Sequence, residues 1–286
     1  MSGAETTVLG AIAGATIFLG LPLGRVRRLS PSIRNFLAAL SAGILLFIFW
    51  DVTGAAAETI ENALLAAKDG SGSWGRFMVF AVMGAGGLAL GAFSLAWLER
   101  MMLRHRPLPP MAGGSVDAPP AAAMGVDPAA VAEQARKAAL ALGMLIAIGI
   151  GVHNFSEGLA IGVASKSGEI ALAGTLIIGF ALHNATEGFG IVGPLQGMRP
   201  TWRWLILAGV IGGGPTFLGT IVGYRVSSEP LELAFLALAA GAILFVIGEL
   251  WAGAMRRAGR MLVLYGIIGG FLLGFATDLV LVSAGA

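Results

Sequence analysis

Eight apolar stretches, each close to the length of a membrane-crossing helix, leave this chain few ways to fold. Their approximate bounds are 6–24, 34–56, 75–98, 138–164, 171–193, 204–224, 232–253 and 261–282. A helix of about 20 apolar residues crosses the hydrocarbon core of a bilayer. Charged residues are 12% of the chain, against roughly 25% in a soluble domain. The sequence therefore predicts an all-α polytopic membrane protein with eight transmembrane helices.

Basic residues are divided unevenly between the two ends of these stretches. If successive spans alternate in direction, one side holds only Lys68, Arg76, Lys166 and Arg225, and the other holds the remaining 14 of the 18 Lys and Arg. Loops on the cytoplasmic side carry the excess of Lys and Arg. We therefore expect both termini outside, in a multi-pass protein of the cell membrane, and a bacterial inner membrane is the favoured location.

One connection differs in composition from the rest. Residues 99–137 are rich in Pro, Ala and Gly, and they predict a flexible cytoplasmic loop that ends in a helix start near Asp127 and Pro128. The chain is thus expected to divide into helices 1–3 in residues 1–98 and helices 4–8 in residues 138–286, a 3+5 arrangement. The absence of cysteine excludes disulfides and thiolate metal ligands.

A short polar phrase occurs twice inside the fourth and fifth spans. It reads His153-Asn154-Phe155-Ser156-Glu157-Gly158 and then His183-Asn184-Ala185-Thr186-Glu187-Gly188. In each copy His and Glu are four residues apart, so both project from one face of the helix. Ionisable residues at membrane depth usually face a pathway or a partner, and imidazole with carboxylate suits a divalent cation such as zinc.

The two copies are expected to face each other. A short connection, 165–170, joins their spans, which must then run antiparallel. The predicted metal ligands are His153, Glu157, His183 and Glu187, with carbonyl oxygens of Asn154 and Asn184 as additional donors. The alternative is a duplicated phrase that serves helix packing alone.

These residues resemble the ZIP family of divalent metal transporters. The resemblance rests on His-Asn-x-x-Glu-Gly in the fourth span, a second such phrase in the fifth, and Gly193-Pro194 after it. Eight spans, outward termini and a long loop after the third span agree with it. The resemblance implies two ligand-bearing helices at the centre of the fold, and an elevator-like movement of the helices that carry the site against a scaffold.

The chain departs from the family pattern at several positions. The family usually has Pro before the motif's Glu, where Ser156 and Thr186 stand here and are expected to bond back to the preceding turn. Asn184 replaces a frequent Asp, and Thr216 stands where the sixth span of the family carries a Glu. A second metal site of the family type would therefore lose charged ligands, and we expect one strong site.

Other polar residues are predicted as pathway or auxiliary groups. Asp51 lies within the second span and Glu249 within the seventh, at depths where an acid is costly. The hydroxyls of Ser156, Thr186 and Thr216 join this group, since they lie beside or between the predicted ligands.

The sequence thus favours a transporter of divalent transition-metal ions, with zinc first and Fe, Mn, Co, Ni or Cd as other substrates, moving metal toward the cytoplasm. It is not expected to be an enzyme. Its expected partners are the metal ion and the lipid bilayer, without nucleic acid, and a homodimer is left open. Two alternatives remain: an intramembrane zinc-dependent hydrolase, and a non-transporting metal-binding protein of the same fold.

Overall fold

The structure is a computed structural model that describes residues 1–26, 30–103, 127–168, 170–195, 198–226 and 228–283. Within these ranges every regular element is a helix, and eight segments are long and apolar enough to cross a membrane, as predicted. The elements are α1 Gly3–Ala15, α2 Ile17–Gly20, η1 Leu21–Arg25, α3 Pro31–Asp69, α4 Trp74–Leu103, α5 Pro128–Lys166, α6 Ile170–Val192, η3 Gly193–Leu195, α7 Trp202–Arg225, α8 Glu229–Arg257 and α9 Arg260–Ser283.

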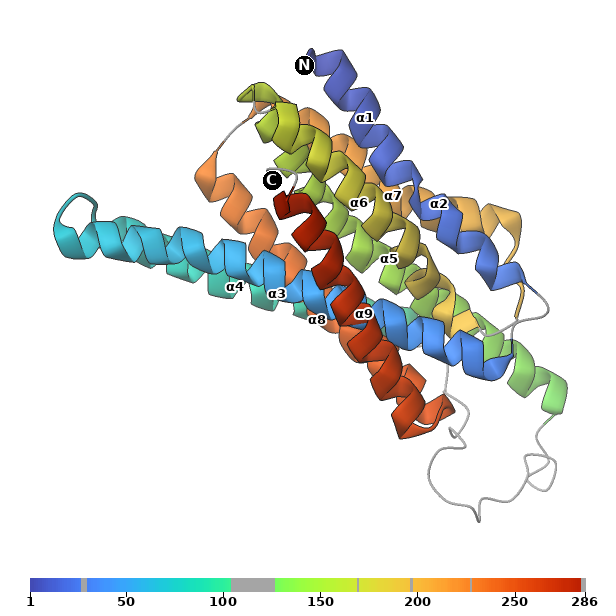
Figure 1. Ribbon diagram of the computed structural model, residues 1–286. Coiled ribbons are helices and arrows are strands. Elements are labelled where there is room, and N and C mark those ends of the chain that lie inside the picture. The colour runs from blue at the N-terminus through green and yellow to red at the C-terminus, as the bar shows by residue number, and fades with distance from the viewer. Residues whose placement is uncertain (27–29, 104–126, 169, 196–197, 227, 284–286) are drawn as a thin grey trace.

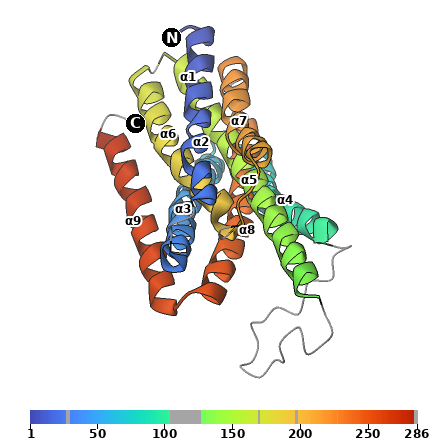
Figure 2. The same cartoon turned by 90° about the vertical axis from the view of Figure 1, so that its right-hand side faces the viewer.

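The start of α1 and the end of α9 lie toward the same end of the molecule (Figures 1 and 2). Contacts at this end join residues far apart in the sequence. The Tyr224 hydroxyl donates to the Met1 carbonyl at 3.4 Å, and the Lys166 ammonium donates to the Arg225 carbonyl at 3.2 Å. Arg76 forms an ion pair with Glu229. Each of the four basic residues of the sparsely charged side, Lys68, Arg76, Lys166 and Arg225, lies in the first or last turn of a helix.

Several helices, α3, α4 and α5 among them, are longer than their apolar stretches predicted, so residues 99–103 and 128–137 of the predicted loop are helical. α3 continues from residue 56 to Asp69 because its Ala-rich continuation contains no helix breaker before Gly70, which ends the helix in the left-handed region with φ 82°. α4 continues to Leu103, and α5 begins at Pro128 behind Asp127, whose carboxylate accepts from the Ala129 amide. The predicted helix start at Asp127 and Pro128 is therefore confirmed, and the part of the predicted loop at 104–126 lies outside the described residues.

The first span is not one helix. It changes from α1 to α2 at Thr16, whose hydroxyl donates to the carbonyls of Ala13 and of Ala181 on α6, both at 2.7 Å. Pro22 then occupies the 3₁₀ turn of η1, because it cannot donate an intrahelical hydrogen bond. This break ties the first span to α6 and turns the Ala13 carbonyl toward other donors.

The helices pack as two bundles. We call α1, α2, α5, α6 and α7 the site bundle, and α3, α4, α8 and α9 the scaffold bundle. Within each bundle, glycines allow backbone to approach backbone. A Cβ at Gly158 or Gly219 would collide with the facing backbone across α5 and α7, and one at Gly270 would collide with the α3 backbone from α9. Such approach is typical of tightly packed helices in lipid.

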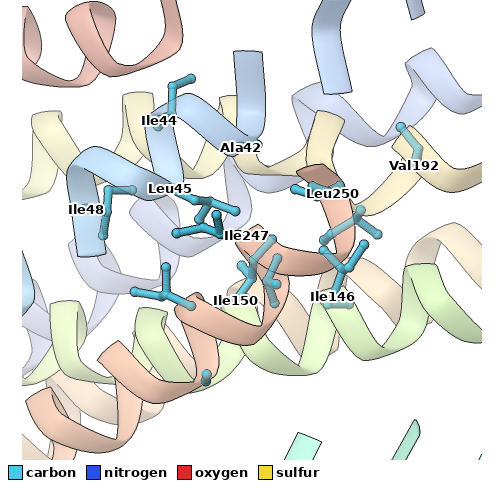
Figure 3. Packing of buried hydrophobic residues seen from close by; sticks show 14 of the residues in the cluster. Ala42, Ile44, Leu45, Ile48, Ile146, Ile150, Val192, Ile247 and Leu250 are labelled. Carbon is cyan, nitrogen blue, oxygen red and sulfur yellow. The ribbon is translucent and has the colours of Figure 1, made fainter. Parts of the chain in front are cut away.

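The contact between the bundles is built differently. It is formed by aliphatic side chains, including Leu45 and Ile48 of α3, Ile146 and Ile150 of α5, and Ile247 of α8 (Figure 3). Gly149 of α5 faces α8, but the nearest atoms to its absent Cβ belong to the Val246 and Leu95 side chains. At these glycines the closest backbone-to-backbone approaches lie within a bundle, whereas between the bundles the nearest atoms to Gly149 are side-chain atoms.

Candidate metal centre

The two repeated phrases lie on antiparallel helices of the site bundle. α5 ends at Lys166 and α6 begins at Ile170, so the predicted short connection is confirmed. All four predicted ligands are buried, with relative exposures of 1% for His153, 5% for Glu157, 7% for His183 and 1% for Glu187. Four ionisable side chains are thus removed from both lipid and solvent at the crossing of α5 and α6.

The side chains of the two phrases approach one another across the helices. His153 Nε2 lies 3.1 Å from Glu157 Oε1 on the same helix and 3.9 Å from Glu187 Oε1 on α6. His183 Nδ1 lies 4.0 Å from Glu157 Oε1. The Glu157 carboxylate is therefore placed between the two imidazoles, and each phrase contributes a histidine and a carboxylate to one cluster.

Apart from the 3.1 Å contact between His153 Nε2 and Glu157 Oε1, the donor atoms of this cluster form no hydrogen bond within the described part of the protein. Both ring nitrogens of each histidine, Oε2 of Glu157 and both carboxylate oxygens of Glu187 are buried without a hydrogen-bond partner. Buried polar atoms are nearly always hydrogen-bonded, and a group without a partner costs about 1–3 kcal/mol. So many unpaired acceptors and nitrogens in one place are typical of a site for an external ligand.

The spacing can be compared with that of a tetrahedral zinc site. Zinc bonds of about 2.0–2.1 Å at tetrahedral angles place neighbouring ligand atoms about 3.3 Å apart. The three distances, 3.1, 3.9 and 4.0 Å, lie near this value. Even so, no group of three or more His, Cys, Asp or Glu in the described ranges has the arrangement of a ready-made metal site. A small inward movement of the side chains is needed before all four donors surround one ion.

The cluster lies at the inner end of a cavity of about 280 Å³. His153, Ser156, Glu157 and His183 line it from the site bundle. The scaffold bundle lines the opposite wall with Phe47, Ile48, Asp51, Val52, Ala55, Glu232, Leu236 and Asp278. The cavity thus opens between the two bundles, and the predicted pathway residue Asp51 belongs to its wall.

Ser156 and Thr186 bond back to the preceding turn, as the sequence predicted. The Ser156 hydroxyl donates to the His153 carbonyl at 2.6 Å, and the Thr186 hydroxyl donates to the His183 carbonyl at 2.7 Å. Each hydroxyl therefore fixes the turn that presents its histidine. Of the two, only Ser156 lines the cavity.

The two asparagines are not part of the cavity lining. Asn154 donates through Nδ2 to the Gly212 carbonyl of α7 at 2.9 Å, and Asn184 donates to the Ala13 carbonyl of α1 at 3.1 Å. Their Oδ1 atoms are buried and have no hydrogen-bond partner. Both residues therefore anchor the ligand helices to α7 and α1.

Two further auxiliary candidates, like Thr186, lie outside the cavity wall. Thr216 is fully buried on α7, its Oγ1 has no partner, and its carbonyl accepts from the Thr220 hydroxyl at 2.8 Å. Glu249 is partly exposed on α8, where the charges near it are those of Glu99 and Arg256. The cavity is lined by residues near the start of α8, whereas Glu249 lies near its end. The structure therefore does not bring Glu249 to the histidines.

Two lining acids were missed by the sequence interpretation, Glu232 and Asp278. Asp278 is an acid inside the predicted span 261–282, which is the same signal that singled out Asp51. Glu232 is the first residue of the predicted span 232–253 and has the pattern of a solvated helix start. Only the tertiary structure relates either of them to the histidines.

The architecture is that of an all-helical, multi-pass membrane protein with a buried His and Glu cluster between helices. No protein-family model matches the chain, and no curated protein matches it. The similarity to ZIP transporters therefore stays a resemblance of motifs and layout.

Proposed function

We propose that this protein transports divalent transition-metal ions, zinc first among them, across the membrane toward the cytoplasm. The observation that carries the proposal is the convergence of His153, Glu157, His183 and Glu187, which are buried with unpaired donor atoms and of which all but Glu187 line a cavity. In apolar surroundings such a cluster is costly unless a ligand compensates for it.

The charge of the cluster matches a divalent cation. Two carboxylates with two neutral imidazoles are neutralised by one ion of charge +2, which makes an occupied site tolerable in lipid. The ligands must be deprotonated to bind, so protons compete with metal for the same atoms. Imidazole nitrogen and carboxylate oxygen suit zinc well, and Fe, Mn, Co, Ni and Cd are the other candidate substrates.

The two bundles support an elevator-like movement. Backbone contacts at glycines lock α5 to α7 inside the site bundle, whereas aliphatic side chains alone fill much of the surface between the bundles. A rigid group carrying the metal cluster is thereby able to slide along the scaffold without breaking backbone contacts. The cluster belongs wholly to the site bundle, so it would move as a unit.

We further propose three helices before and five after the segment 104–126, with both termini outside. The 14 to 4 division of basic residues supports this sidedness. On this assignment the cavity reaches the outer side, because its wall includes Glu232 in the first turn of α8 and Asp278 near the end of α9. Metal from outside would then reach the cluster directly.

Uptake of zinc into proteoliposomes that contain a metal-sensitive dye tests the function. Wild-type protein is expected to admit zinc, and a His153→Gln, His183→Gln double variant is expected to lose uptake. Glu61→Gln is the matched control, since Glu61 is an exposed acid on α3 outside the cavity wall. Zinc binding without uptake would instead identify a non-transporting metal-binding protein.

The hydrolase alternative predicts a different result. A catalytic zinc keeps an open coordination position and needs a general base in addition to its ligands. It would appear as zinc-dependent cleavage of a lipid or peptide substrate in detergent, with no accumulation of metal inside vesicles.

A further inference from the structure

The cavity has two chemically different walls. Its inner end carries the imidazoles and Glu157 from the site bundle. Its opposite wall carries three further carboxylates, and each comes from a different helix of the scaffold bundle: Asp51 from α3, Glu232 from α8 and Asp278 from α9. Three acids from three helices meet at one cavity only through the tertiary fold.

The acids and the buried donors form one electrostatic unit. Asp51 is near enough to interact by charge with Asp278 on one side and with His153 and Glu157 on the other. No Lys or Arg belongs to the described cavity wall. Arg76, which lies near the start of α4, is already paired with Glu229. The described wall is therefore acidic, which favours a cation in the cavity.

The size of the cavity indicates the state of the ion. Six waters around a divalent cation take about 180 Å³ at about 30 Å³ per water. The cavity volume of about 280 Å³ accommodates such a hydrated ion. At the inner end, the ring nitrogens of the two histidines and Oε2 of Glu157 are buried and unpaired. Direct binding of the ion to these atoms requires the loss of some of its waters. The two walls thus suit successive stages, first a hydrated ion and then a dehydrated one.

We propose that Asp51, Glu232 and Asp278 form an entrance site that binds a hydrated divalent cation and passes it to the His153, Glu157 and His183 donors. This inference rests on the proposed transport function. Because the three acids belong to the scaffold and the donors to the site bundle, movement of the site bundle separates the loaded ion from the acids. The acids then raise the rate of loading and take no part in release.

The test compares the rate of metal binding in an Asp51→Asn, Asp278→Asn double variant with that of the wild type. Stopped-flow measurement of zinc binding in detergent is expected to show about a tenfold lower association rate constant in the variant at an ionic strength of about 0.01 M. At about 1 M, where charges are screened within about 3 Å, the difference is expected to fall below about twofold. The KM for uptake rises in parallel at low salt, and one ion still binds per chain.

Glu61→Gln is the control, because it removes one exposed acid of α3 that lies outside the cavity wall. It is expected to match the wild type at both salt concentrations. If the double variant fails to fold, Glu232→Gln, at an exposed position in the first turn of α8, serves in its place with an expected decrease of about two- to threefold.

The outcomes separate the two proposals. Equal association rates and equal salt dependence in wild type and variants overturn the entrance site, even if transport is intact. Absence of zinc binding and uptake in the wild type overturns the proposed function itself. A slower rate that persists unchanged at high salt also contradicts the inference, because it indicates a structural effect and not an electrostatic one.

Discussion

Replacing Glu157 by glutamine tests whether its carboxylate is a metal ligand or a structural partner of histidine. The carboxylate is buried, with Oε1 3.1 Å from His153 Nε2 and 4.0 Å from His183 Nδ1, while Oε2 is unpaired. Glutamine keeps the size of the side chain and removes its charge. Loss of one partner from a buried charged cluster costs about 3–5 kcal/mol. Since 1.4 kcal/mol is tenfold in affinity, we expect the zinc Kd to rise roughly a hundredfold to several thousandfold.

The same substitution is expected not to decrease the thermal stability of the metal-free protein. Glutamine removes a buried carboxylate whose Oε2 has no hydrogen-bond partner among the described residues, so the thermal midpoint of metal-free Glu157→Gln in detergent is expected to equal or exceed that of the wild type. At zinc 100-fold above the wild-type Kd, metal stabilises the wild type by about 2.7 kcal/mol. A hundredfold weaker variant gains only about 0.4 kcal/mol at that concentration. The zinc-dependent rise in melting temperature therefore largely disappears.

Titration calorimetry and thermal denaturation with and without zinc measure both effects. Glu187→Gln is expected to behave in the same way, and Glu61→Gln is expected to change neither quantity. If both ligand variants bind zinc as tightly as the wild type, neither glutamate is a ligand. If the metal-free variants instead melt several degrees lower, the carboxylates serve a structural ion pair, and the reasoning about an uncompensated site is refuted.

Three further predictions concern stoichiometry, pH and packing. Calorimetric titration is expected to find one strong divalent ion per chain, because Asn184 and Thr216 are uncharged; two sites of similar affinity would contradict this. Zinc affinity is expected to fall as pH decreases from about 7.5 to about 5.5, the range in which histidine ordinarily gains a proton that excludes metal; equal binding across that range would exclude imidazole ligands. Gly219→Ala is expected to cost about 1–3 kcal/mol in thermal denaturation, because its Cβ would collide with the α5 backbone. Gly248→Ala on α8, with no atom within 4 Å of the added Cβ, should be neutral or stabilising, and equal melting of the two variants would show that the α5–α7 contact is not close-packed.

Features that depend on local sequence were predicted correctly. The number of membrane-length helices follows from apolar length alone, since a single apolar stretch of about 20 residues satisfies its own backbone in hydrocarbon only as a helix. The antiparallel placement of α5 and α6 follows from their short connection, and the four-residue spacing puts each His beside its Glu. The back-bonds of Ser156 and Thr186 are likewise local, because a hydroxyl inside a helix reaches the carbonyl of the preceding turn.

Features that depend on which helices become neighbours were decided by the tertiary structure. Apolar side chains are equally stable against lipid and against other helices. The sequence of an apolar helix therefore does not indicate which face packs against other helices and which faces the bilayer. For this reason the sequence did not indicate that the cavity is lined by Asp51, Glu232 and Asp278 but not by Glu249, which is also an acid inside an apolar span. The break at Thr16 has the same origin, because its hydroxyl gains a second acceptor only where α6 presents the Ala181 carbonyl. Sequence alone determined which chemical groups enter the membrane, and the packing of the two bundles determined which of them meet.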